Sequence, residues 1–396
     1  MSGRVKGFRF AGVHGGIKGG DRLDLGLICA DAPAVASGVF TRNRVRAAPV
    51  QISERRLRSG RCQAVLVNSG NANACTGKQG QNAALAVTRT VARSLRVRSS
   101  LVVPASTGVI GVQLPRENIE AAIPDLVDDL SAAGASRFAR AILTTDRGPK
   151  VARAELRVGR TTCRLLGIAK GAGMIHPNMA TTLAFVTTDA PLHGPTLSRF
   201  LRHATELSFN RATVDGDTST NDSIYALASG AASTRTIEEH SAAGRRFLSA
   251  LTELLESLAT KIVADGEGAE HLVRIVVRGA RTDSDAVQIA RTIAGSQLVK
   301  TALYGCDPNW GRILAAAGRS GARFNPDHVS VQIGEVSIFE HGTPVMTAKT
   351  EAKAAATMKR AEYEISVEVG SGRGLGHYWT CDLGHEYVRI NADYRT

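Results

Sequence analysis

The sequence predicts an α/β fold, and three observations support that prediction. Short β-branched runs alternate along the chain with stretches whose apolar residues recur at helical spacing, the pattern typical of this class. Hydrophobic residues make up 43% of the chain and charged residues 21%, as in an ordinary globular protein. At 396 residues the chain is long enough to bury one large core or two ordinary ones.

Three strands are expected in the first half, each next to a loop of unusual composition. Residues 62–68 form the first strand, and a glycine-rich turn connects it to a helix at about 82–95. Residues 101–104 form the second strand and run into Ser106, Thr107 and Gly108. Residues 183–188 form the third. The loops at these strand ends hold the candidate functional residues.

The second half is expected to add helices and strands that build a core. Apolar residues recur at three- and four-residue steps over 247–262, which predicts a buried helix that ends at Asp265 and Gly266. Alternating and helical spacings predict the remaining elements. These are a strand at 272–277, a helix at 286–298, a hairpin of 329–333 and 336–339, a helix at 346–361 and a strand at 363–369.

The chain is strongly basic, with 49 Lys and Arg against 36 Asp and Glu and a formal charge of +13. Such a charge raises nucleic acid as a partner. The basic residues are scattered, however, without interleaved aromatic residues, and the sequence contains no DNA-binding motif. We therefore expect no nucleic-acid partner, but a basic surface that attracts substrates bearing carboxylates.

The sequence favours a cytoplasmic location and no membrane partner. No uncharged apolar run approaches the ~20 residues that span a bilayer, and the first residues lack the apolar segment of a signal peptide. The six cysteines are scattered singly, without the spacing of a structural zinc site. They are expected to be reduced thiols, as in a cytosolic protein.

The acidic run at 215–222, DGDTSTND, resembles a calcium loop at first sight. Counted from Asp215, the sixth position is Thr220 where a calcium-binding EF-hand needs glycine, and the twelfth is Ala226 where it needs a bidentate Glu. The run is therefore interpreted as a hydrogen-bonded structural loop, and no metal is expected.

The segment at 167–185 has an unusual composition, because Gly, Pro, Asn and two threonines lie between apolar flanks that both look like strands. A tight loop is implied. A threonine hydroxyl becomes a good nucleophile when the threonine is the first residue of a chain, since its own amine then acts as the base. Such chemistry would require a cut before Thr181. Taken alone, an Ala-Thr-Thr sequence in a loop is more often without function.

The string KGAGMIHPNMATTLAF at 170–185 resembles the self-cleavage signature of the glutamate N-acetyltransferase and ornithine acetyltransferase family of arginine biosynthesis. Further blocks resemble the same family in order along the chain, so the resemblance covers essentially all of it. They are TRN at 41–43, AAPV at 47–50, NSGNANACTG at 68–77, ASTGVIG at 105–111, ILTTD at 142–146, FNRATVDGDTSTNDS at 209–223, ADGEG at 264–268, LVKTALYGCDPNWGR at 298–312 and INADYRT at 390–396.

The resemblance implies an α/β fold of mixed sheets layered with helices, related to that of self-processing aminopeptidases. It also implies autocatalytic cleavage between Ala180 and Thr181, into an α-chain of residues 1–180 and a β-chain of residues 181–396 that remain one folded unit. Two copies of each chain are expected to assemble as α2β2.

The resemblance further implies a role for individual residues. Thr181 is the catalytic nucleophile, and Thr107 with Gly108 forms the oxyanion hole, although the same Ser-Thr-Gly string would otherwise read as a simple turn. Hydroxyls and a lysine suit the α-carboxylate of the substrates, and an acidic side chain suits the ornithine ammonium. The implied substrate-binding residues are Thr144, Lys170, Thr181, Glu267, Asn391 and Thr396.

The implied reaction is ping-pong transfer of an acetyl group from N2-acetylornithine to glutamate, giving ornithine and N-acetylglutamate. No cofactor is expected. Family members that also accept acetyl-CoA as a co-substrate share these motifs, so both possibilities stay open. Two alternatives remain: a self-processing aminopeptidase of related fold, in which water accepts the acyl group, and a non-catalytic basic protein that binds nucleic acid in a salt-dependent way.

Overall fold

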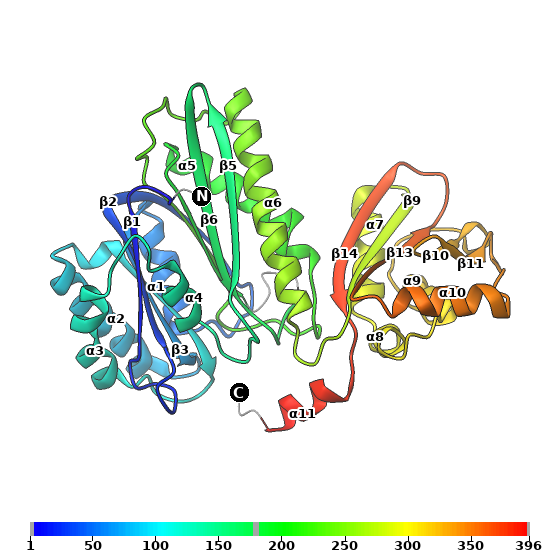
Figure 1. Cartoon of the computed structure of the whole chain (residues 1–396), viewed down its shortest axis with the longest axis horizontal. Helices are drawn as coiled ribbons and strands as arrows, with labels where there is room; N and C mark the ends of the chain where they lie inside the picture. Colours follow the sequence, from blue (N-terminus) through cyan, green and yellow to red (C-terminus); the bar gives the residue numbers. More distant parts are fainter. Residues whose placement is uncertain (1–3, 177–181, 394–396) are drawn as a thin grey trace.

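The structure is a computed structural model, and it describes residues 4–176 and 182–393. The chain forms two parts, each built on a β-sheet with helices packed against it (Figure 1). This arrangement confirms the predicted α/β class. In the first part, seven strands follow one another in the order β4 (Val102–Val109), β3 (Arg61–Asn71), β2 (Leu25–Phe40), β8 (Ser223–Ala228), β7 (Leu183–Thr188), β6 (Thr161–Lys170) and β5 (Lys150–Val158), with β1 (Phe8–Val13) paired to β2.

This first sheet is mixed. The pairs β3–β4 and β7–β8 are parallel, and the other pairs are antiparallel. Strands β7 and β8 follow the Ala180–Thr181 bond in sequence, and they lie between β6 and β2, which both precede it. Lys170, the last residue of β6, is opposite Leu183, the first residue of β7. Residues from both sides of that bond therefore build one sheet.

Helices cover both faces of the first sheet. Alternate residues of β6 point to opposite faces: Leu165 packs in the core with α5 and α6, while Leu166 packs in the core with Phe138 of α4. The helix α6 buries the apolar stripe predicted for 247–262, and Ser241 caps its first turn by accepting from the Gly244 N–H. The helices of this part are α1 (Ala48–Leu57), α2 (Gly77–Leu95), α3 (Arg116–Asp128), α4 (Ala135–Ala141), α5 (Gly194–Leu207) and α6 (Ala242–Ala264).

The second sheet is smaller, and its parallel pair β9–β13 lies between antiparallel pairs. Its strand order is β12 (Thr343–Pro344), β11 (Val336–Glu340), β10 (Ser330–Ile333), β13 (Glu362–Glu368), β9 (Leu272–Ala280) and β14 (Gly374–Cys381). Its helices are α7 (Asp283–Ala294), α8 (Gln297–Tyr304), α9 (Trp310–Gly318) and α10 (Ala348–Met358). The last helix, α11 (His385–Asp393), leaves β14 and runs back toward the first part (Figure 1).

Two expectations about local structure are wrong. The helix predicted at 286–298 is two helices, because α7 ends at the Gly295 cap and Ser296 caps a new helix by accepting from the Val299 N–H. Thr107 and Gly108 are not in a turn but belong to β4, where they pair with Ser69 and Gly70 of β3. The predicted hairpin and the strand at 183–188 are confirmed.

Within residues 4–176 and 182–393, none of the helices has the length and apolar character needed to cross a bilayer.

Candidate active site

A small cavity lies at the ends of β4 and β6, where the segments around residues 144, 173, 220, 267 and 391 converge. It collects most of the residues that the sequence predicted to be functional: Thr107, Gly108, Thr144, Lys170, Glu267 and Asn391. The other predicted residues, Ala180, Thr181 and Thr396, lie outside the described residues.

Gly108 brings two strands into close contact at the wall of this cavity. Its φ is +129°, and a Cβ there would lie 2.3 Å from the carbonyl carbon of Gly70. Only glycine fits this position. The strand end is fixed further by Asn221, whose Nδ2 donates to the Ser106 carbonyl at 2.8 Å and to the Ala72 carbonyl at 2.7 Å. The backbone next to Thr107 is therefore held rigidly.

Lys170 links two threonines of the cavity, Thr107 and Thr144. Its Nζ donates to Thr144 Oγ1 at 2.8 Å and to Thr107 Oγ1 at 3.3 Å. The side chain is buried, and burial lowers the pKa of Lys170, although the charge of Asp146 opposes this shift. Since the Thr107 oxygen accepts from the lysine, its own hydroxyl hydrogen remains to donate to a group in the cavity.

Asp146, which the sequence did not single out, lies next to the cavity residues Thr144 and Lys170. Its Oδ1 accepts the Gly171 N–H at 2.7 Å and its Oδ2 accepts the Thr144 N–H at 2.9 Å. Burial alone would raise the pKa of this carboxyl, but the charges of Lys170 and Lys150 outweigh burial and hold the pKa well below its usual range. Asp146 is thus an anion that balances the buried Lys170. The available signal was its position two residues after Thr144.

Glu267 and Asn391 close the opposite side of the cavity. Asn391 Nδ2 donates to Glu267 Oε2 at 2.8 Å, which ties α11 to the loop after α6. A Cβ at Gly173 would lie 2.3 Å from Glu267 Oε2, so a glycine is required to leave room for the carboxylate. The Glu267 N–H also donates to the Ala172 carbonyl at 2.9 Å. Glu267 is therefore positioned by neighbours on two segments, the loop after β6 and α11.

The acidic run at 215–222 is a hydrogen-bonded loop, as predicted, and it holds both flanks of the segment 177–181. Asp215 Oδ1 accepts the Ile175 N–H at 2.9 Å, and Asp222 Oδ1 accepts the Thr182 N–H at 2.9 Å. Burial raises the pKa of Asp215 to about 6 although backbone N–H groups oppose the shift. Met174, next to Ile175, has a φ of +59°, which is unusual for a residue other than glycine.

His176 is the last described residue before that segment. Its Nδ1 lies 3.2 Å from Thr213 Oγ1, and its Nε2 lies 3.0 Å from an Arg291 nitrogen. Burial, with a smaller effect of the Arg291 charge, lowers the pKa of His176 to about 4. The ring is consequently neutral at physiological pH and accepts a hydrogen bond from the arginine.

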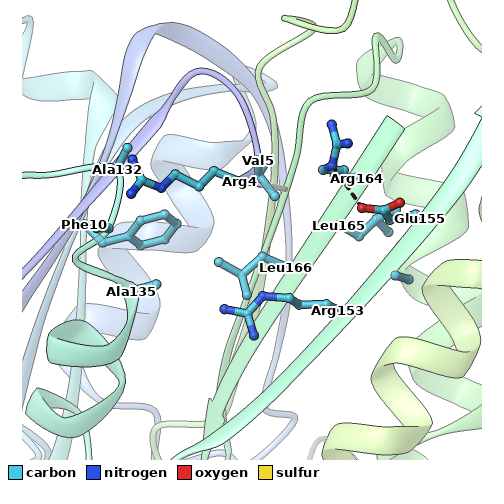
Figure 2. A pocket seen from close by; sticks show the side chains of 12 residues that line it. Arg4, Val5, Phe10, Ala132, Ala135, Arg153, Glu155, Arg164, Leu165 and Leu166 are labelled. Atoms are coloured by element: carbon cyan, nitrogen blue, oxygen red, sulfur yellow. Dashed lines mark hydrogen bonds and ion pairs between the residues drawn. The ribbon is translucent and has the colours of Figure 1, made fainter. Parts of the chain in front are cut away.

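A larger cavity, of about 570 Å³, lies between β6 and the beginning of α4 and does not contain the predicted residues. Figure 2 shows Arg4 and Arg153 extending along it over Phe10 and Leu166. Arg164 is engaged with Glu155, at 3.0 Å between Nε and Oε1. The one carboxylate of this lining, Glu155, is paired with Arg164, and the described lining has no hydroxyl, thiol, lysine amine or imidazole. The smaller cavity is the candidate active site, because it brings together the residues that the sequence predicted.

Comparison with known proteins gives a consistent result. The model of the ArgJ family matches residues 9–396. The arginine biosynthesis bifunctional protein ArgJ of Geobacter sulfurreducens is 47% identical over 392 residues, which cover 99% of this chain and 100% of that protein. The ArgJ of Thermosynechococcus vestitus is 46% identical over 407 residues, covering 99% and 97%. A crystal structure of ArgJ from Bacillus halodurans matches 53% of this chain and 98% of its own, with 44% identity and a TM-score of 0.51.

Proposed function

The chain belongs to the ArgJ family and is an acyltransferase of arginine biosynthesis, and we propose that it carries the acetyl group on Thr181. The donor is N2-acetylornithine and the acceptor is glutamate. Cleavage between Ala180 and Thr181 first frees the threonine amine, which then serves as the base for the adjacent hydroxyl.

In the first half-reaction, Thr181 Oγ attacks the acetyl carbonyl while its α-amine accepts the hydroxyl proton. The Thr107 hydroxyl and the Gly108 N–H donate to the oxygen that becomes negative in the tetrahedral intermediate. When the intermediate collapses, the C–N bond breaks, the α-amine returns the proton to the leaving nitrogen, and ornithine departs. The amine of glutamate then attacks the acetyl ester, and the α-amine of Thr181 accepts its proton. The C–Oγ bond breaks, Oγ takes that proton back, and N-acetylglutamate is released.

The observation that carries this proposal is the meeting of Thr107, Lys170 and Glu267 in one cavity. They come from β4, the end of β6 and the loop after α6, so the folded chain, and not local sequence, brings them together. The charges suit the substrates: Lys170 attracts an α-carboxylate, and Glu267 attracts the ammonium group at the end of the ornithine side chain.

Two observations support self-cleavage. Lys170 and Leu183 are paired opposite each other, so the chain leaves β6 and enters β7 at the same end of the sheet, beside the cavity. The match with the solved ArgJ chain from Bacillus halodurans covers 98% of that chain but 53% of this one. The solved chain is therefore little more than half as long as this chain. A processed fragment would have such a length.

We also propose that the transfer reaction uses no cofactor, that acetyl-CoA serves as a second acetyl donor, and that two α-chains and two β-chains assemble together. The name bifunctional that its relatives bear supports a second donor.

Intact-mass spectrometry of the purified protein tests the proposal. We expect two fragments, one of which begins at Thr181, and acetyl transfer from N2-acetylornithine to glutamate. Thr181→Ala should give a single unprocessed chain with no transferase activity, while Thr182→Ser should still be processed. A wild-type chain of full mass would overturn self-cleavage. Release of free acetate without N-acetylglutamate would instead indicate a hydrolase, as in an aminopeptidase.

A further inference from the structure

Three potential metal ligands meet outside the active site, where β9 begins and β14 ends. Glu270 and His271 directly precede β9, and Asp382 directly follows β14. These two strands are antiparallel neighbours, with Leu272 opposite Cys381. One ligand atom from each of the three side chains lies within 4.8 Å of the other two.

Asp382 is held so that one of its oxygens remains available. Its Oδ1 accepts the N–H groups of Glu270 and His271, both at 2.9 Å. Its Oδ2 is buried and has no hydrogen-bond partner among the described residues, and the same is true of His271 Nδ1. The aspartate side chain is 0% exposed and the histidine side chain 9% exposed. Buried polar atoms without partners are rare and require an explanation.

The separation of these two atoms suggests what satisfies them. His271 Nδ1 lies 3.4 Å from Asp382 Oδ2. A charge-assisted N–H···O bond is shorter, at about 2.7–2.9 Å. Two ligands that each lie about 2.0–2.2 Å from a tetrahedral ion are separated by roughly 3.3–3.6 Å. The observed distance fits a shared ion better than a direct hydrogen bond.

We propose that Glu270, His271 and Asp382 bind a divalent transition-metal ion of the Zn²⁺ type. One imidazole nitrogen and two carboxylates form a ligand set suited to such an ion, and the exposed Glu270 leaves room for water at the remaining position. The two N–H groups on Asp382 Oδ1 orient the carboxylate, as hydrogen bonds around metal ligands commonly do. The sequence predicted no metal, because the run at 215–222 does not match an EF-hand and the cysteines are scattered. Glu270 and Asp382 are 112 residues apart, and no spacing motif links them.

The position of the site indicates a structural role. None of its three residues lines the active-site cavity. However, Glu267 lies three residues before Glu270, and α11, which carries Asn391, begins three residues after Asp382. An ion that clamps the two segments would fix how the Glu267–Asn391 pair enters the cavity. Metal binding itself does not depend on the acetyl-transfer reaction, so either proposal can fail without the other.

Metal binding can be measured directly on the full protein. After treatment with EDTA and dialysis against buffered Zn²⁺, we expect about one Zn²⁺ per chain by elemental analysis, and a higher melting temperature than the metal-free protein. His271→Ala and Asp382→Asn should each weaken Zn²⁺ binding by at least about 10-fold. Asp382→Asn retains Oδ1 as an acceptor for both N–H groups, and circular dichroism reports whether each variant folds.

Two further variants make the experiment decisive. Glu270→Gln changes an exposed side chain, so it should weaken Zn²⁺ binding without affecting the fold. His377→Ala is the matched control, because His377 Nε2 lies 3.5 Å from Glu256 Oε1 in a similar pair that no third ligand joins in the described chain. It should leave the stoichiometry unchanged. The proposal would be overturned if the wild-type protein bound no stoichiometric Zn²⁺. It would also be overturned if the His271→Ala and Asp382→Asn variants bound Zn²⁺ as tightly as wild type.

Discussion

The backbone N–H of Thr182 donates to Asp222 Oδ1 at 2.9 Å. Thr182 is the first described residue after the proposed cleavage bond, and it is 3% exposed. A carboxylate from the acidic loop therefore fixes the chain where β7 begins. On the other flank Asp215 holds Met174 and Ile175 in the same way. Both anchors bear on the proposed cleavage, because they hold the backbone on either side of residues 177–181.

Asp222→Ala should slow self-cleavage. The substitution leaves the buried Thr182 N–H without its acceptor, which costs about 1–3 kcal/mol. We expect unprocessed precursor to accumulate on denaturing gels, and Asp222→Asn, which retains an acceptor oxygen, to be affected less. The control is Asp217→Ala, since Asp217 is exposed in the same loop. If the Asp222→Ala and Asp217→Ala variants were processed at the same rate, Asp222 would have no role in self-cleavage.

Thr107→Val should lower kcat for acetyl transfer by about 10²- to 10³-fold, because it removes one donor to the negative oxygen of the intermediate. The two side chains have nearly the same shape, so KM should change little. The melting temperature should fall modestly, because the buried Lys170 Nζ loses the Thr107 oxygen as an acceptor. Thr187→Val is the control: its buried hydroxyl on β7 has no hydrogen-bond partner in the described structure and does not line the cavity. Comparable rates for the Thr107 variant and wild type would exclude the oxyanion role.

Glu267→Gln should discriminate between the two amino acids. Ornithine carries a side-chain ammonium and glutamate does not. The loss of the Glu267 carboxylate charge should therefore weaken the reaction with N2-acetylornithine and leave the reaction with glutamate nearly unchanged. Hydrogen bonds to charged groups contribute about 1.5–3 kcal/mol, which corresponds to roughly a 10- to 100-fold decrease in kcat/KM for N2-acetylornithine. Glu335→Gln, at an exposed turn, should have no effect. A similar decrease for glutamate would contradict this assignment.

His176 predicts a specific pH dependence of stability. Its pKa in the folded protein is about 4, below the ordinary value of 6.5, so the unfolded chain binds more protons between these values. This residue therefore lowers stability as the pH falls from about 6.5 toward 4. Asp215, whose pKa is raised to about 6, acts in the opposite direction.

The His176 contribution can be isolated by comparing wild type with His176→Gln. When the pH is lowered from 7 to 5, the melting temperature should fall less in the variant than in wild type, because the variant has no imidazole to protonate at this position. Parallel curves for the two proteins would show that the histidine does not titrate as its surroundings indicate.

Local patterns were sufficient for elements whose signal is continuous, such as the apolar stripe of α6 and the strand at 183–188. They failed where pairing with a distant segment decides the conformation. Thr107 and Gly108 read as a turn, yet Gly108 is held in β4 by its neighbour Gly70 on β3. Asp146 gave little signal because its role depends on Lys150 and Lys170, which contact it only in the folded chain.

The placement of β7 and β8 between β6 and β2 also limits what cleavage can do to the molecule. After cleavage between residues 180 and 181, β7 and β8 of the β-chain would still be hydrogen-bonded to β6 and β2 of the α-chain within one sheet. The two polypeptides should travel as one species in gel filtration at any dilution and separate only in denaturant. Each alone would expose unpaired strand edges, so expression of either fragment by itself should yield aggregate.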